Sequence, residues 1–293
     1  MAGARPLLAG PHWEYEVTPI QVVRAGAGSP AFRILFALSL GASSLGAQRS
    51  VYIEDLTWPE VQQAIAAGKT SAIIYTGSTE QNGPHMAIGK HNFIARWVAG
   101  AIAIKLGNAL VYPTLPFAIT GDLTQKTGHM RFPGSVSLTA QTFRNVVHDV
   151  ATSAADAGFK NVFIMGDHGD GQNELAAAAK ELDAQWKPRG VRIFYVGDLY
   201  NKEKAQARAY AASHGLPTTD VHAGFDDTSE LMALDANHRW IRSDKLAASK
   251  GARTAITGVD GDPTKSSPTL GNIFLQYKID DAVAAIGQLL RAH

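Results

Sequence analysis

The 293-residue chain contains no cysteine. This absence excludes disulfide bonds, thiolate nucleophiles and cysteine-based zinc sites. Charged residues make up only 18% of the chain, and its formal net charge is +1, with no basic or acidic block. Strong electrostatic binding to nucleic acid or to an anionic membrane is therefore not indicated. Hydrophobic residues make up 45% of the chain, which is ordinary for a soluble globular protein with a sizeable core.

The most apolar run near the N-terminus, residues 34–40, is too short to anchor a protein in a bilayer. Arg33 precedes this run, and small residues follow it as far as Ala47. A basic flank, a short apolar core and a small-residue exit are typical of a secretory signal peptide. We therefore expect residues 1–47 to be a leader, with export to the periplasm or the medium and no membrane attachment after processing. If the leader is instead an apolar helix packed on the domain, the protein stays in the cytoplasm.

Apolar segments alternate with amphipathic segments through residues 48–293, without an internal repeat or a clear linker. This alternation predicts βαβ units and one α/β domain, with a mostly parallel sheet covered on both faces. Strands are expected at residues 71–75, 109–112, 161–165 and 191–196. Helices are expected at residues 57–67, 92–106, 139–157, 173–185, 205–213, 228–234 and 279–291.

Unusual polar residues follow two of the expected strands. The stretch GSTEQNGPH covers residues 77–85, and GDHGDGQN covers residues 166–173. A third polar cluster, HAGFDDTSE, precedes an expected helix at residues 222–230. In open parallel sheets, ligands bind beyond the carboxyl ends of the strands. The first two clusters are therefore expected at the ligand-binding edge of the sheet.

Histidine and carboxylate side chains in these clusters are the ligands that zinc, manganese or iron accept. Each cluster alone is a weak signal, because a glycine-rich turn with an aspartate is commonly a helix cap and a lone histidine is commonly structural. Three clusters together favour a metal site over these simpler explanations.

The same clusters, in this order, resemble the creatininase (creatinine amidohydrolase) family. TWPEV at residues 57–61 and HMRFPGSVSL at residues 129–138 also fit that family. The resemblance implies a three-layer α/β/α fold and a metal-dependent hydrolase of C–N bonds in cyclic amides and related small molecules. It also implies a homo-oligomer, with a hexamer as the common assembly.

The resemblance assigns roles to individual residues. Glu80 matches the first metal-ligating glutamate, and His168 matches the ligating histidine of the glycine-rich turn. Asp170 stands where the family has a ligating glutamate or a small residue, so it is expected as a ligand or as a proton carrier. His222 matches a histidine near the scissile bond, and Asp227 matches a nearby carboxylate; both are candidates for proton transfer.

Two positions depart from the family pattern. Asn82 replaces a metal-ligating histidine, and His91 replaces an aspartate that bridges two metal ions. An imidazole nitrogen binds one metal and cannot bridge two as a carboxylate does. We therefore expect a site built on Glu80, His91, His168 and Asp170 that holds one strongly bound ion, zinc before manganese or iron. The expected substrate-binding residues are Asn82, His85 and His129, and Lys90 beside His91 is expected to be a solvated surface residue.

Two other functions fit the same residues. The metal site can act on an ester or a lactone instead of an amide. The altered ligands also fit a non-catalytic protein that binds a small molecule, although the presence of both Glu80 and His168 with His222 disfavours this.

Overall fold

A computed structural model gives the fold of residues 50–250 and 256–292, except for residues 198 and 219–220. These residues belong to one unit, Ala47–His293. The expected leader and its cleavage site lie outside the described residues.

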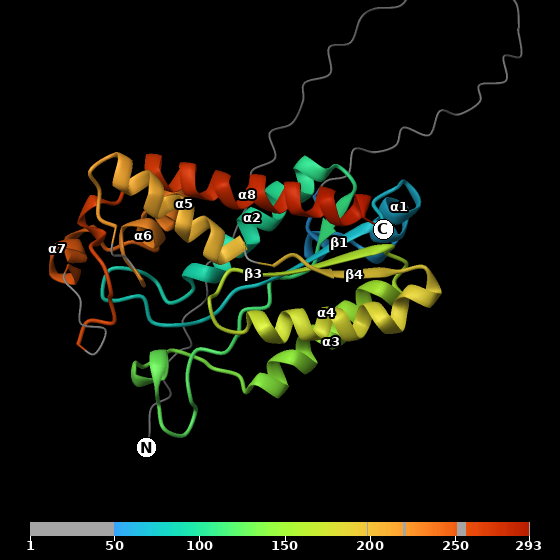
Figure 1. Cartoon of the computed structure of the whole chain (residues 1–293), viewed down its shortest axis with the longest axis horizontal. Coiled ribbons are helices and arrows are strands. Elements are labelled where there is room, and N and C mark those ends of the chain that lie inside the picture. The colour runs from blue at the N-terminus through green and yellow to red at the C-terminus, as the bar shows by residue number, and fades with distance from the viewer. Residues whose placement is uncertain (1–49, 198, 219–220, 251–255, 293) are drawn as a thin grey trace, which may run out of the picture. The chain divides into compact units, whose positions relative to one another are not determined.

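Four parallel strands form the sheet at the centre of this unit, in the order β2-β1-β3-β4 (Figure 1). The strands are β1 (Ser71–Thr76), β2 (Ala109–Val111), β3 (Asn161–Gly166) and β4 (Arg192–Tyr195). Ser71 pairs with Asn161 and Thr76 with Gly166, so β1 and β3 end at the same level. All four expected strands are confirmed, with bounds shifted by at most one residue.

Helices cover both faces of the sheet, which confirms the three-layer α/β/α architecture. The helices are α1 (Trp58–Ala66), α2 (Lys90–Leu106), α3 (Ala140–Asp156), α4 (Gln172–Trp186), α5 (Leu199–Ser213), α6 (Phe225–Leu234), α7 (Leu246–Ser249) and α8 (Pro268–Arg291). Helices α3 and α4 lie on one face, and α2 and α8 lie on the other (Figure 1). Among the described residues, no helix is long and apolar enough to cross a membrane.

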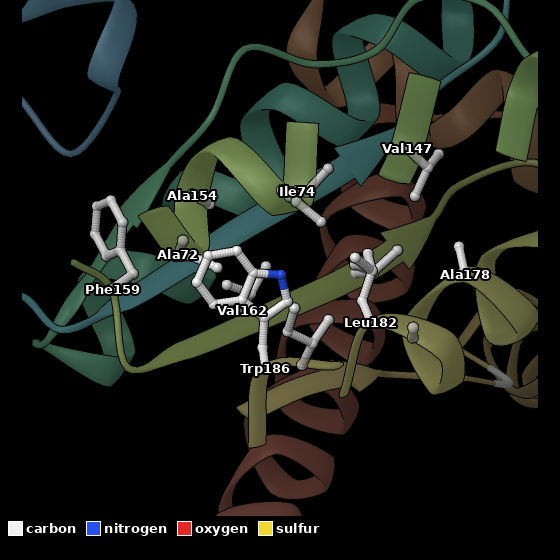
Figure 2. Packing of buried hydrophobic residues seen from close by; sticks show 14 of the residues in the cluster. Ala72, Ile74, Val147, Ala154, Phe159, Val162, Ala178, Leu182 and Trp186 are labelled. Atoms are coloured by element: carbon white, nitrogen blue, oxygen red, sulfur yellow. The ribbon is translucent and has the colours of Figure 1, made fainter. Parts of the chain in front are cut away.

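The two hydrophobic cores follow from the alternation of side chains along β1 and β3. Ala72, Ile74 and Val162 pack against α3 and α4, and α4 contributes Leu182 and Trp186 to this core (Figure 2). The intervening strand residues, such as Ile73 and Phe163, pack against α2 and α8 on the opposite face. Successive side chains of a strand point to opposite faces, so a strand covered on both sides reads as a continuous apolar run.

Helix starts were predicted less well than strands. Thr57 and Glu60 form a capping box at the start of α1, and Thr139 caps α3 through its side chain, so these two helices begin within one residue of the expected starts. Helix α2 begins at Lys90, two residues before the expected start at residue 92, and the Asn92 amide donates a hydrogen bond to Thr79. Helix α8 begins at Pro268, eleven residues before the expected start at residue 279.

The strand ends bring the polar clusters together. The backbone N–H of Asp167, just beyond β3, donates a 2.9 Å hydrogen bond to the carbonyl of Thr76 at the end of β1. The loop after β1 leads directly into α2, and α6 packs closely on α8. At that contact a Cβ on Gly271 would lie 1.9 Å from the Ser229 carbonyl oxygen, so only glycine permits the approach. The polar clusters that follow β1 and β3 therefore meet at the carboxyl edge of the sheet.

Candidate active site

Glu80 is the centre of the site, in the loop between β1 and α2, and its side chain is fully buried. Four imidazoles surround its carboxylate. His168 Nε2 lies 2.6 Å from Oε2 and His91 Nε2 lies 3.0 Å from Oε1. His129 Nε2 lies 3.6 Å from Oε2, and His222 Nδ1 lies 3.8 Å from Oε1. Two groups of potential metal ligands result, an inner group of Glu80, His91 and His168 and an outer group of Glu80, His129 and His222.

Both histidines of the inner group are held so that Nε2 faces Glu80. His91 lies in the first turn of α2, and its Nδ1 is 2.9 Å from Asp167 Oδ2. His168 follows β3, and its Nδ1 is 3.3 Å from the backbone oxygen of Asp170. A carboxylate or carbonyl on the far nitrogen is the usual support of a metal-ligating histidine. The inner group is therefore oriented as a set of three metal ligands.

Charge also suits the inner group to a cation. Burial raises the pKa of Glu80, but His168 and His91 outweigh this effect and hold that pKa well below the ordinary value. Burial lowers the pKa of His168, but the carboxylate of Glu80 outweighs it and raises that pKa. Among the described residues, none donates a well-directed hydrogen bond to the buried Glu80 Oε2. One carboxylate and two imidazoles are a donor set that fits a divalent metal ion.

The outer group is linked to Gln81. His129 Nδ1 lies 3.0 Å from Gln81 Nε2, and His222 Nε2 lies 2.9 Å from the Gln81 backbone oxygen. Burial lowers the pKa of His129. Burial, reinforced by the charge of Lys90, lowers the pKa of His222 to about 3. Both outer imidazoles are therefore neutral near pH 7.

Buried charges lie directly behind the site. Lys278 Nζ, from α8, lies 2.9 Å from Asp167 Oδ1 and 2.8 Å from Glu230 Oε2. Lys90 Nζ lies 2.8 Å from Asp227 Oδ2, and Lys204 Nζ lies 2.6 Å from Asp227 Oδ1. A chain of contacts thus runs from Glu230 through Lys278 and Asp167 to the His91 imidazole.

This network bears on two expectations, and one of them is wrong. Lys90 is fully buried and paired with Asp227, whereas the sequence predicted a solvated residue. Burial raises the pKa of Asp227, but Lys204 and Lys90 outweigh it and hold that pKa well below its ordinary range. A carboxylate held by two ammonium groups is a poor proton acceptor, so this geometry does not support the expected role of Asp227 as a proton carrier.

Asp170 also lies apart from the expected site. The residue is exposed, and its carboxylate belongs to neither group of potential ligands. The next residue, Gly171, has a φ of 89° and caps α4. The turn presents the backbone oxygen of Asp170, not its carboxylate, to His168. This geometry does not support Asp170 as a metal ligand.

The expected substrate-binding residues occupy different places. Asn82 is buried, and its amide donates hydrogen bonds to the backbone oxygens of Glu80 and Ala87, so it supports the loop. His85 is buried with Nε2 3.0 Å from Thr228 Oγ1, outside both ligand groups. His129 lies in the outer group beside Glu80.

Sequence reasoning assigned no role to Asp167 or Gln81. Both lie next to residues that it selected, His168 and Glu80. Their contacts join positions 76 and 48 residues apart in the chain, His91 with Asp167 and Gln81 with His129. The only sequence signal for a role of Asp167 and Gln81 is that each adjoins an expected metal ligand.

A buried carboxylate among imidazoles, at the carboxyl edge of a parallel sheet, defines an α/β protein with a candidate metal centre where open sheets bind ligands. The family profile "Creatininase: Creatinine amidohydrolase" matches residues 54–286. This match covers most of the chain, so the protein belongs to the creatininase family and is a hydrolase of that family.

Individual relatives agree with this membership. The chain is 25% identical over 255 residues to a "Mycofactocin precursor peptide peptidase" of Mycobacterium ulcerans, covering 79% of this chain and 86% of the relative. It is 26% identical over 190 residues to a "Creatinine amidohydrolase" of Pseudomonas putida, covering 64% of this chain and 72% of the relative.

Solved structures share the fold. A crystal structure of creatinine amidohydrolase aligns with a TM-score of 0.66 at 23% identity, covering 82% of this chain and 98% of the other. Other creatininase structures with the same fold are named for their metals, one as "Creatininase Mn" and one mutant as "Zn-Zn type". At this identity the likeness establishes the fold alone.

Proposed function

We propose that the protein hydrolyses a C–N bond, in an amide or cyclic amide of a small molecule, with one divalent metal ion held by Glu80, His91 and His168. The observation that carries the proposal is the buried carboxylate of Glu80 between two imidazoles whose other nitrogens are held by Asp167 and by a backbone carbonyl. Two histidines and one carboxylate favour zinc, and manganese or iron fits the same donors.

A metal ion in such a site polarises a carbonyl and makes bound water more acidic. The side chains of this protein supply the remaining chemistry. His222 is neutral, and its Nδ1 faces Glu80, so Nδ1 is placed to take the proton of the attacking water. Because the pKa of His222 is low, this transfer needs the acidification of water that a bound metal ion would supply. After water oxygen bonds to the carbonyl carbon, the C–N bond breaks and His222 returns the proton to the leaving nitrogen. Glu80 stays ionised throughout, because its low pKa keeps it a metal ligand.

The choice of a C–N bond is supported by the names of the relatives, since amidohydrolases and peptidases both hydrolyse such bonds. The alternatives are a lactone or ester hydrolase on the same metal site and a protein that binds a small molecule without turnover. Family membership also supports a homo-oligomer, which we include in the proposal together with export.

A substrate panel tests the proposal. Protein stripped with a chelator and reloaded with zinc is assayed against cyclic amides, short peptide amides and matched lactones. We expect turnover of at least one amide, dependent on added metal, with the lactone of the same ring size turned over more slowly. Faster lactone turnover would favour the esterase alternative, and binding without turnover across the panel would favour the non-catalytic alternative.

A further inference from the structure

The side-chain amide of Gln81 has only one consistent orientation. The backbone N–H of Gly83 donates a 2.9 Å hydrogen bond to Gln81 Oε1, and Gln81 Nε2 donates a 2.9 Å hydrogen bond to the carbonyl of Gly258. Exchanging the amide oxygen and nitrogen would place two donors together at Gly83 and two acceptors together at Gly258. Nε2 of Gln81 therefore points toward the histidines as a donor.

This donor determines which nitrogen of His129 carries the proton. His129 Nδ1 lies 3.0 Å from Gln81 Nε2, so Nδ1 accepts a hydrogen bond. A neutral imidazole that accepts at Nδ1 carries its proton on Nε2. Nε2 is the atom 3.6 Å from Glu80 Oε2, so His129 presents an N–H to the site.

The backbone of Gln81 determines the opposite role for His222. His222 Nε2 lies 3.2 Å from Gln81 Nε2, but the two protons of that amide are donated to the Gly258 carbonyl and to His129. His222 Nε2 also lies 2.9 Å from the Gln81 carbonyl oxygen, which can only accept, so Nε2 carries the proton. Nδ1 then has a free lone pair and is the atom 3.8 Å from Glu80 Oε1. Both histidines are the same tautomer, but they face the site with different atoms.

We infer that Gln81 fixes the tautomers of the outer imidazoles, so that His129 faces Glu80 with an N–H donor and His222 faces it with a lone pair. This arrangement keeps the outer group from holding a second metal ion. A metal ligand must offer a lone pair, and His129 Nε2 offers one only if its proton moves to Nδ1, where Gln81 presents an N–H. Building on the proposed function, the N–H of His129 binds the substrate carbonyl oxygen as negative charge develops there. Gln81 is thus a positioning residue that acts through both histidines.

The wild-type protein gives the first test. Histidine is labelled with ¹⁵N, and long-range ¹H–¹⁵N spectra are recorded for the metal-free protein and after addition of zinc. We expect His129 and His222 to be protonated on Nε2 in both states, while the signals of His91 and His168 change with the first equivalent. A proton on Nδ1 of His129, or a second zinc equivalent that shifts His129 and His222, would overturn the inference. If the wild type binds no zinc, the proposed function fails, and the metal-free spectrum still decides the tautomers.

The variant Gln81→Met gives the second test, because it removes the side-chain donor and leaves the backbone carbonyl that holds His222. We expect a second, weaker zinc equivalent that includes His129, whereas a purely structural role of Gln81 would only weaken the first equivalent. The control is Gln63→Met on the exposed surface of α1, which should bind one equivalent as the wild type does. A Gln81→Met protein that binds one equivalent and keeps the proton of His129 on Nε2 would contradict the inference; if this variant does not fold, the wild-type spectra decide.

Discussion

Replacing Lys278 with methionine tests whether the charges behind the site stabilise the fold. Lys278 is 3% exposed, and its ammonium group contacts the carboxylates of Asp167 and Glu230 at 2.9 and 2.8 Å. Methionine keeps much of the side-chain volume but leaves two buried carboxylates without their shared cation. Breaking a buried ion pair from one side costs about 3–5 kcal/mol.

This cost predicts a large fall in melting temperature. A domain of 150–250 residues loses about 2–4 °C per kcal/mol, so the Lys278→Met variant should melt about 6–20 °C below the wild type by calorimetry. Zinc affinity should change much less, because Asp167 remains to hold the His91 imidazole. Adding Asp167→Asn should recover part of the stability, since it removes one of the uncompensated charges, and should lower zinc affinity about 10–100-fold, since it alters the support of His91.

Lys105→Met is the matched control. Lys105 pairs with Asp280 across α2 and α8, but both side chains are about half exposed. An exposed pair contributes about 0–1 kcal/mol, so this variant should melt close to the wild type. Equal melting temperatures for the two variants would refute the reasoning.

Three further predictions concern the site and the leader. His168→Ala should lose metal binding and turnover together, whereas His222→Ala should keep the metal and lose about 10²–10⁴-fold in rate; normal turnover in His222→Ala with a lowered melting temperature would remove His222 from the mechanism. His85 is neutral in the fold, because burial, reinforced by Lys90, lowers its pKa to about 4 from 6.5. As pH falls, the imidazole of His85 is therefore protonated in the unfolded chain before it is protonated in the folded one. Through this group, the free energy of unfolding decreases by about 2 kcal/mol from pH 7 to pH 5. Denaturant titrations should show a shallower pH dependence for His85→Gln, and an unchanged slope would exclude His85 as the cause. N-terminal sequencing of the natural protein should find a chain that begins just after Ala47, whereas a mature chain beginning before residue 30 would exclude export.

The strands and the central ligands could be predicted from the sequence because their signals are local. Apolar runs such as residues 71–75 read as buried strands, and Glu80 and His168 follow such runs directly. Parallel strands end at one edge of the sheet, so strand order alone places these two residues together.

Other features could not be predicted because their causes are distant in the chain. The Lys90–Asp227 and Asp167–Lys278 pairs join positions 137 and 111 residues apart. A lysine is seldom fully buried unless it is paired, and no local pattern shows the partner. The early start of α8 did have a local signal, a Ser267 cap followed by Pro268, but Gly271 in the first turn is a poor helix former. That glycine serves the close approach of α6 instead.

Zinc titration into chelator-treated protein tests the central claim most directly, with wild type and Glu80→Gln compared by calorimetry and turnover followed in the same samples. The amide introduced by this substitution keeps the size of the Glu80 side chain but removes the charge on which the metal site depends. We predict one tightly bound equivalent per wild-type chain, turnover that rises in proportion to it, and neither binding nor turnover in Glu80→Gln. Full turnover without metal, or equally tight binding by Glu80→Gln, would contradict the account.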